Sequence, residues 1–145
     1  MEGMPHVDST ENSLKVLQVV PSFYPAVEFG GPIFSTLTIC EGVSSHPDVD
    51  VEVLTTDTAR NSAGNRIQLS QRLVTFRNRF KVRYCRRTML TSVSIELLFR
   101  LPNALRKAQV IHLTGPYSFP VIPTLLFAKM LKKPVVWSPR GGFQA

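Results

Sequence analysis

Two features near the start of this chain constrain its fold most strongly: the segment Lys15–Pro21 (KVLQVVP) and the triplet Gly30–Pro32 (GGP). The first has the composition of a buried strand, and an apolar helical pattern begins at the second. Two adjacent glycines let the backbone approach a ligand closely, because no Cβ intervenes. A helix that begins there directs free N–H groups at the preceding loop, where phosphate commonly binds. The pattern predicts a phosphate-bearing ligand at the C-terminal edge of a parallel sheet.

Strand and helix patterns alternate along the rest of the chain. The residues 57–70 are polar and predict a surface loop, and Pro102 should kink or split the helix that contains it. This alternation predicts an α/β fold: a Rossmann-like, doubly wound, mostly parallel sheet of about five strands with helices on both faces. We expect strands at Lys15–Val20, Val49–Thr56, Phe80–Cys85, Gln109–Leu113 and Pro134–Trp137 (the last two buried), a short edge strand or turn at Leu73–Phe76, and helices at about Pro32–Ser45, Thr91–Lys107 and Phe119–Leu131.

The length of 145 residues suits one domain with a hydrophobic core. We place that domain at residues 14–145, after a lead-in of residues 1–13 that we expect to be disordered. The domain should be truncated, because a glycine-rich loop at 140–145 leaves a strand without a covering helix. The chain has no apolar run of about 18 residues and no secretory signal pattern. Cys40 and Cys85 lack metal or redox spacing, so buried free thiols in a cytoplasmic protein are expected.

Charge is distributed unevenly along the chain. Nine of the ten acidic residues lie in residues 1–57, and twelve of the seventeen Lys and Arg lie in residues 60–107. The basic middle could contact an anionic membrane surface, which would place the protein peripherally on its inner face, or it could simply be solvated. Nucleic acid is the least favoured partner, because few aromatic residues are interleaved there for base stacking.

Three loops should leave the C-terminal ends of parallel strands and gather at one edge of the sheet. They span 22–31, 114–119 and 138–142. A guanidinium beside two glycines, as in the third loop, suits an anion. The candidate donor- and acceptor-binding residues are Gly30, Gly31, Thr114, Gly115, Arg140, Gly141 and Gly142.

Each of these motifs also has a purely structural interpretation. The paired glycines do not form the G-x-G-x-x-G fingerprint and could belong to an ordinary turn. Thr114-Gly115 could be a simple strand-to-helix turn, and Arg140 could be solvated. His112 lies in an apolar run, where a histidine is more often a hydrogen-bonded core residue than a catalyst. The chain has no P-loop, zinc spacing or Ser/His/Asp order, so no catalytic residue and no metal are assigned.

With these loops identified, the chain resembles the N-terminal half of a GT-B glycosyltransferase of the glycosyltransferase 4 family. The resemblance covers nearly all of Leu14–Gln144, and it depends on the order and spacing of segments that are individually weak. Those segments are VLQVVPSFYP at 16–25, GGP at 30–32, VEVLTT at 51–56, AQVIHLTG at 108–115 and KPVVWSPRGG at 133–142.

The resemblance implies transfer of a sugar from a nucleotide-sugar donor to a glycan or lipid-linked acceptor, in polysaccharide or envelope glycan synthesis, without a bound metal or cofactor. Gly30 and Gly31 would lie beside the donor diphosphate and transferred sugar. The loops that begin at Thr114 and Ser138 would face acceptor or sugar.

The chain departs from the family pattern in two ways. Many members carry His-x-His at the end of the fourth strand, whereas this chain has His112-Leu113-Thr114. The family's second domain, which holds the nucleotide, contributes a basic pair and paired glutamates that these residues lack. We therefore expect the isolated chain to be inactive in transfer.

Two other function classes remain open. A stand-alone nucleotide-binding or regulatory Rossmann-like module would explain the glycine loop without catalysis. A nucleic-acid-binding module would explain the calculated pI of about 9.9.

Overall fold

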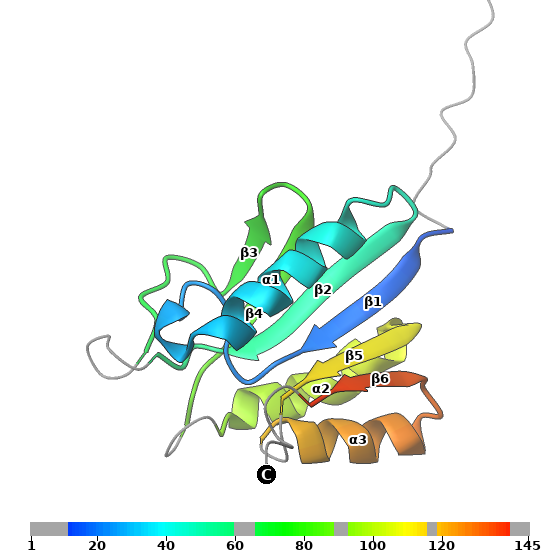
Figure 1. The fold of residues 1–145 in the computed structure, drawn as a ribbon. Helices are drawn as coiled ribbons and strands as arrows, with labels where there is room; N and C mark the ends of the chain where they lie inside the picture. The colour runs from blue at the N-terminus through cyan, green and yellow to red at the C-terminus, as the bar shows by residue number, and fades with distance from the viewer. Residues whose placement is uncertain (1–11, 60–65, 89–92, 116–118, 140–145) are drawn as a thin grey trace, which may run out of the picture.

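A computed structural model of the chain describes residues 12–59, 66–88, 93–115 and 119–139. One sheet of six strands has the order β3-β4-β2-β1-β5-β6 (Figure 1). All neighbouring strands run parallel except β3 and β4, which form an antiparallel hairpin. The elements are β1 (Leu14–Val19), the short 3-10 helix η1 (Val27–Phe29), α1 (Gly31–Ser44), β2 (Val49–Thr56), β3 (Leu73–Phe76), β4 (Phe80–Cys85), α2 (Ile95–Lys107), β5 (Val110–Thr114), α3 (Val121–Met130) and β6 (Val135–Ser138).

The predicted α/β class and the mostly parallel sheet are confirmed, with six strands rather than about five. Leu73–Phe76, which fitted either an edge strand or a turn, is the edge strand β3. The predicted bounds of β2 and β4 match the structure, because both strands alternate in polarity along their length.

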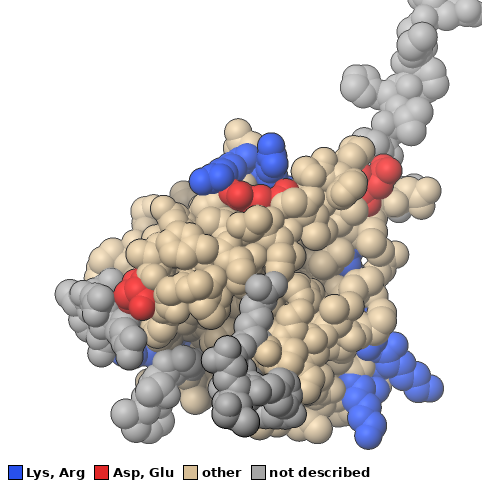
Figure 2. Space-filling model, in the orientation of Figure 1, with Lys and Arg blue, Asp and Glu red and all other residues tan. Residues whose placement is uncertain are grey.

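Alternate side chains of β1 belong to two separate hydrophobic cores. Leu17 and Val19 pack with residues of α2 and α3, whereas Val16 and Val20 pack with residues of α1. Because successive side chains of a strand point to opposite faces, α1 covers one face of the sheet and the pair α2 and α3 covers the other. Lys and Arg side chains of the described residues lie toward the rim in the view of Figure 2.

The prediction that the last strand is buried is wrong. In the described part of the chain β6 is an edge strand that pairs with β5 alone, and Val136 is 54% exposed. The apolar run indicated a central position, but a run of four residues does not distinguish a central strand from an edge strand whose one face is packed.

The predicted surface loop at 57–70 is also partly wrong. Asp57, Thr58, Ala59 and Ile67 are buried, and Thr58 forms an isolated antiparallel bridge with Arg66. The Ile67 amide donates to the Asp57 carbonyl at 2.8 Å, so this polar segment folds back over the end of β2.

The α2 helix continues through Pro102 instead of splitting there. Its first turn is capped by Ser94, whose buried hydroxyl accepts from the Leu97 amide at 3.1 Å and donates to the Arg86 carbonyl at 2.7 Å. At its other end the Lys133 ammonium donates to the Arg106 and Ala108 carbonyls. These contacts connect α2 to the end of β4 and to the segment that precedes β6.

Cys40 and Cys85 are both buried free thiols, as predicted. Burial raises the pKa of each thiol to about 12. Both side chains therefore act as small apolar core residues at neutral pH.

The Glu96 carboxylate joins the end of β4 to α2. It accepts from the Arg86 amide at 2.8 Å and from Arg100 Nε at 2.9 Å. Partial burial disfavours its charged form, but these hydrogen bonds outweigh that effect and lower the pKa of Glu96 below its usual value of 4.5. A carboxyl with a lowered pKa in the folded state stabilises the fold above its unfolded pKa and loses that contribution as pH falls.

We therefore expect Glu96→Gln to destabilise the protein at pH 7 by up to about 1 kcal/mol, the range of a largely exposed ion pair. The difference from wild type should shrink as pH falls below about 4.5, where the wild-type carboxyl also becomes protonated. Urea unfolding at pH 7 and pH 3 measures both values. A difference that stays constant between the two pH values would contradict this assignment.

Candidate functional site

The strands β1, β5 and β6 end at the same edge of the sheet (Figure 1). The Gly115 amide donates to the Ser138 carbonyl at 3.3 Å, and Trp137 Nε1 donates to the Gly115 carbonyl at 3.0 Å. Gly115 has φ of 132°, a conformation that favours glycine. The ends of β5 and β6, at Gly115 and Ser138, therefore lie side by side, and most of the two predicted loops that follow them lies outside the described residues.

The paired glycines lie where η1 ends and α1 begins. Gly30 has φ of 77° and ψ of −143°, a backbone conformation that is nearly exclusive to glycine. A Cβ placed on Gly30 or Gly31 would find no atom within 4 Å, so the space beside both residues is open. No side chain caps the N-terminus of α1, and Pro32 contributes no N–H group. The Gly30 amide donates to the Val27 carbonyl at 2.9 Å, and the Ile33 amide donates to the Gly30 carbonyl at 3.1 Å. Within residues 30–33, the Gly31 N–H is therefore the donor that remains for an anionic or polar ligand.

The loop that carries these glycines is held by contacts at its start. Phe23 is fully buried and packs edge-on against the rings of Phe76 and Phe80. Thr56 Oγ1 donates to the Pro21 carbonyl at 2.7 Å, and the Tyr84 hydroxyl donates to the carbonyl of Tyr24. The loop is thus anchored on β2, β3 and β4 before it reaches the glycines.

A buried polar network joins β1, β5 and β6 behind this edge. Gln18, only 2% exposed, donates through Nε2 to Thr114 Oγ1 at 2.9 Å. Its Oε1 contacts Nδ1 of His112, and Nε2 of His112 lies 3.0 Å from the Ser138 hydroxyl. His112 is therefore hydrogen-bonded through both ring nitrogens, which agrees with the structural interpretation of this residue.

The amide of Gln18 determines the proton positions in this network. Because its Nε2 donates to Thr114, its oxygen faces His112, so Nδ1 of His112 carries the proton. In the neutral imidazole, Nε2 then accepts from the Ser138 hydroxyl. Thr114 accepts from Gln18 and retains its own hydroxyl proton as a donor. The network holds Thr114 in a single orientation at the end of β5.

Sequence reasoning missed the part that Gln18 has in the site. The available signal was one amide in an otherwise apolar strand. Its hydrogen-bond partners lie 94 and 96 residues away, so only the strand order reveals them. Arg140, Gly141 and Gly142, the other predicted binding residues, lie outside the described residues.

A carboxylate also stands at the end of β2, the place where many dinucleotide-binding domains hold a ribose. That residue, Asp57, is buried and already engaged: Oδ2 accepts from Arg72 and Oδ1 from the Arg87 amide, at 2.9 and 2.8 Å. Asp57 therefore connects the end of β2 to Arg72 and to the residues that follow β4, and its carboxylate is not available to a ligand.

An apolar groove of about 290 Å³ lies beside the polar network. Gln18 and His112 line it together with Val16, Val43 and Val136. It runs between α1 and the part of β5 and β6 that α1 does not cover. The groove offers an apolar surface next to the hydrogen-bonded end of β5.

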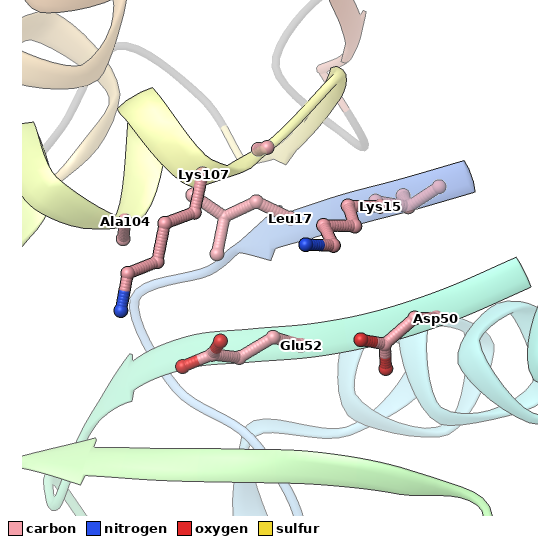
Figure 3. A pocket seen from close by; sticks show the side chains of 8 residues that line it. Lys15, Leu17, Asp50, Glu52, Ala104 and Lys107 are labelled. Carbon is pink, nitrogen blue, oxygen red and sulfur yellow. The ribbon is translucent and has the colours of Figure 1, made fainter. Parts of the chain in front are cut away.

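A second cavity, of about 120 Å³, lies at the opposite edge of the sheet (Figure 3). Lys107 extends from α2 toward β2, which carries Asp50 and Glu52, and Lys15 lies nearby on β1. Two ammonium groups and two carboxylates give this cavity no net charge. Its position at the starts of β1 and β2 separates it from the candidate loops.

The described residues contain no group of three or more His, Cys, Asp or Glu side chains placed to hold a metal ion. Within the same ranges, every helix is too short or too polar to span a bilayer.

Comparison with known proteins found no matching family model, no matching curated protein and no matching solved structure. The observations that bear on function are therefore the geometry of the edge and the residues that form it.

The polar network generates a stability prediction. Gln18→Leu removes the acceptor that faces Nδ1 of His112 and the donor to the Thr114 hydroxyl, so we expect a loss of about 2 kcal/mol or more. The control is Thr55→Val, because the buried Thr55 hydroxyl has no hydrogen-bond partner among the described residues. Removing that hydroxyl should leave stability unchanged or raise it. Urea unfolding midpoints measure both effects, and equal midpoints for wild type and Gln18→Leu would show that the network does not stabilise the fold.

Proposed function

We propose that this domain is the N-terminal, acceptor-side half of a GT-B glycosyltransferase. It would transfer a sugar from a nucleotide-sugar donor to a glycan or lipid-linked acceptor, without metal or cofactor. The observation that carries the proposal is the open backbone of Gly30 and Gly31 at an uncapped helix start, on a sheet edge that also presents Thr114 and Gly115. The Rossmann-like sheet and the resemblance of five ordered segments support it.

The chemistry of sugar transfer matches what this edge offers. Negative charge develops on the leaving diphosphate as the sugar acquires cation-like character. The Gly31 N–H group and the positive end of the α1 dipole favour such charge. Of the described arginines near the end of β2, Arg72 is paired with Asp57, and Arg66 donates to the Arg87 carbonyl. In the proposal, a second domain supplies the cations that neutralise the diphosphate.

Thr114 has a defined part in this proposal. It occupies the place of the second histidine in the resembling family, and its hydroxyl proton is left to donate once Gln18 has bonded its oxygen. A sugar hydroxyl or acceptor oxygen at the end of β5 could accept that proton. The apolar groove beside His112 would accommodate a less polar part of the acceptor.

Binding by the isolated domain can be tested at Gly31. Gly31→Glu adds a side chain where a Cβ meets nothing within 4 Å, and it places an acid in the first turn of α1. The fold should be retained or slightly stabilised, while the carboxylate repels a diphosphate. Amide chemical shifts of Gly30, Gly31 and Gly115 report binding of UDP-glucose or GDP-mannose as probes.

We expect millimolar binding by wild type and at least a tenfold weaker response from Gly31→Glu, roughly the effect of 1.4 kcal/mol of repulsion. Gly42→Glu is the matched control, because it introduces the same charge near the other end of α1 at another position with open space. Equal binding by wild type and Gly31→Glu would refute the assigned role of the glycines.

The purified 145-residue chain should show no sugar transfer. In the proposal a second domain supplies the cations that stabilise the leaving group, and these account for a large part of the rate in such reactions. Product analysis with radiolabelled donors and a panel of acceptors measures this. Sugar transfer by the chain alone would contradict the proposal that a second domain supplies the cations for the leaving diphosphate.

A free-standing nucleotide-binding module is the second candidate. The same uncapped helix start favours it, because a helix N-terminus also accepts the phosphate of a free nucleotide. Calorimetry with UDP and GDP distinguishes the two: micromolar binding by the chain alone supports the module, whereas weak binding that improves with the attached sugar supports the transferase half.

A further inference from the structure

The helix α3 is apolar around its whole circumference, although only one side of it packs on the sheet. Val121, Thr124 and Ala128 are buried, and Lys129 is its one charged residue. A helix of this composition is usually buried on all sides. Its outer side instead exposes a stripe at intervals of four residues: Ile122 at 54%, Leu126 at 61% and Met130 at 76%.

The neighbouring helix α2 extends this apolar surface. Leu97, Leu101 and Leu105 face the core, while Phe99 on the opposite side is 82% exposed and Ile95 is 49% exposed. The two helices contact one another on the same face of the sheet, so their outer sides both point away from it. We call the surface formed by Ile95, Phe99, Ile122, Leu126 and Met130 the outer helical face.

The segment that forms this face is strongly basic. Residues 93–139 contain six Lys and Arg and a single acid, Glu96, which is paired with Arg100. Both helices run antiparallel to the strands, so their C-terminal ends lie together, as the bonds from Lys133 to the end of α2 confirm. Lys and Arg side chains gather at the right-hand end of α3 in Figure 2. The cations at these ends are Arg106, Lys107, Lys129, Lys132 and Lys133.

The basic residues of the β3–β4 region are a weaker candidate for contacts with anions, although the sequence pointed to them first. Several are neutralised by acids within the domain. The ion pairs join Arg72 to Asp57, Arg77 to Glu41 and Arg83 to Glu52. Other cations there, Arg79 and Lys81 among them, are exposed, but Leu73 is the only large apolar side chain that is exposed within the described residues 66–88. The ends of α2 and α3 are therefore the place where cations adjoin an exposed apolar surface.

We propose that the outer helical face docks on an anionic lipid bilayer. The apolar side chains enter the boundary between headgroups and acyl chains, and the cations at the helix ends contact lipid phosphates. A second copy of the chain fits this face less well, because the single acid of residues 93–139, Glu96, is already paired with Arg100, so an identical face offers no free carboxylate to the cations at the helix ends. The proposal is independent of the glycosyltransferase assignment, since it depends only on α2 and α3.

Docking in this way would also position the candidate site. Because α2 and α3 start at the edge where β1, β5 and β6 end, a bilayer on their outer sides lies beside that edge. A lipid-linked molecule would then reach the end of β5 without leaving the bilayer.

Vesicle flotation of the full chain tests the proposal. The probes are phosphatidylcholine vesicles with and without phosphatidylglycerol, at low and at physiological salt. We expect salt-sensitive binding to the anionic vesicles only. Lys129→Gln with Lys132→Gln should lower the partition coefficient about thirtyfold, and Leu126→Gln with Met130→Gln should lower it at least about tenfold.

The matched control is Arg79→Gln with Lys81→Gln, which removes the same charge from exposed positions near the opposite edge of the sheet. It should reduce binding less than threefold. An equal loss from both charge pairs, or no binding by wild type, overturns the proposal. The proposal is also overturned if wild type forms a dimer and does not bind vesicles, and if the double variant Leu126→Gln with Met130→Gln is monomeric. A second copy of the chain would then be the occupant of the outer helical face. Circular dichroism melting verifies that each variant is folded.

Discussion

The need to cover both faces of a parallel sheet determines most of this structure. A parallel strand exposes a largely apolar surface on each side, so helices must pack on both. Here the two helical layers are offset. The core under α1 draws on β1, β2, β3 and β4. The core under α2 and α3 draws mainly on β1, β5 and β6, with one residue each from β2 and β4, Leu54 and Cys85. The strands β1, β2 and β4 therefore contribute to both cores.

The offset explains where polar side chains occur inside the sheet. On the face of the sheet that α1 covers, no side chain of β5 or β6 belongs to the described core. The side chains that β5 and β6 present on this face include His112, Thr114 and Ser138. Gln18 of β1 lies at the boundary between covered and uncovered surface, and its amide satisfies two of these groups. A buried amide is costly unless it is fully bonded, so the network requires the three strands to keep their register.

Sequence reasoning succeeded where a local pattern determines the outcome. The alternating residues of Val49–Thr56 and Phe80–Cys85 marked two strands with their bounds, and parallel topology was enough to bring Gly115 next to Ser138. It failed where position in the sheet decides. The burial of β6 depended on whether another element covers it, and the burial of Asp57 depended on Arg72 and the Arg87 amide. Neither property has a periodic signal in the sequence.

The distribution of charge favours a shared site over a self-sufficient one. A domain that binds a nucleotide alone usually presents a free cation or a ribose-binding carboxylate beside its glycine loop. Here Asp57 and Arg72 neutralise one another, and the donors beside the glycines and at the end of β5 are the Gly31 N–H group and the hydroxyl of Thr114. In the proposed transferase, such groups would orient a sugar and its diphosphate but would do little to offset two negative charges. The proposal therefore assigns the neutralising cations to a second domain that closes over Gly30 and Gly31.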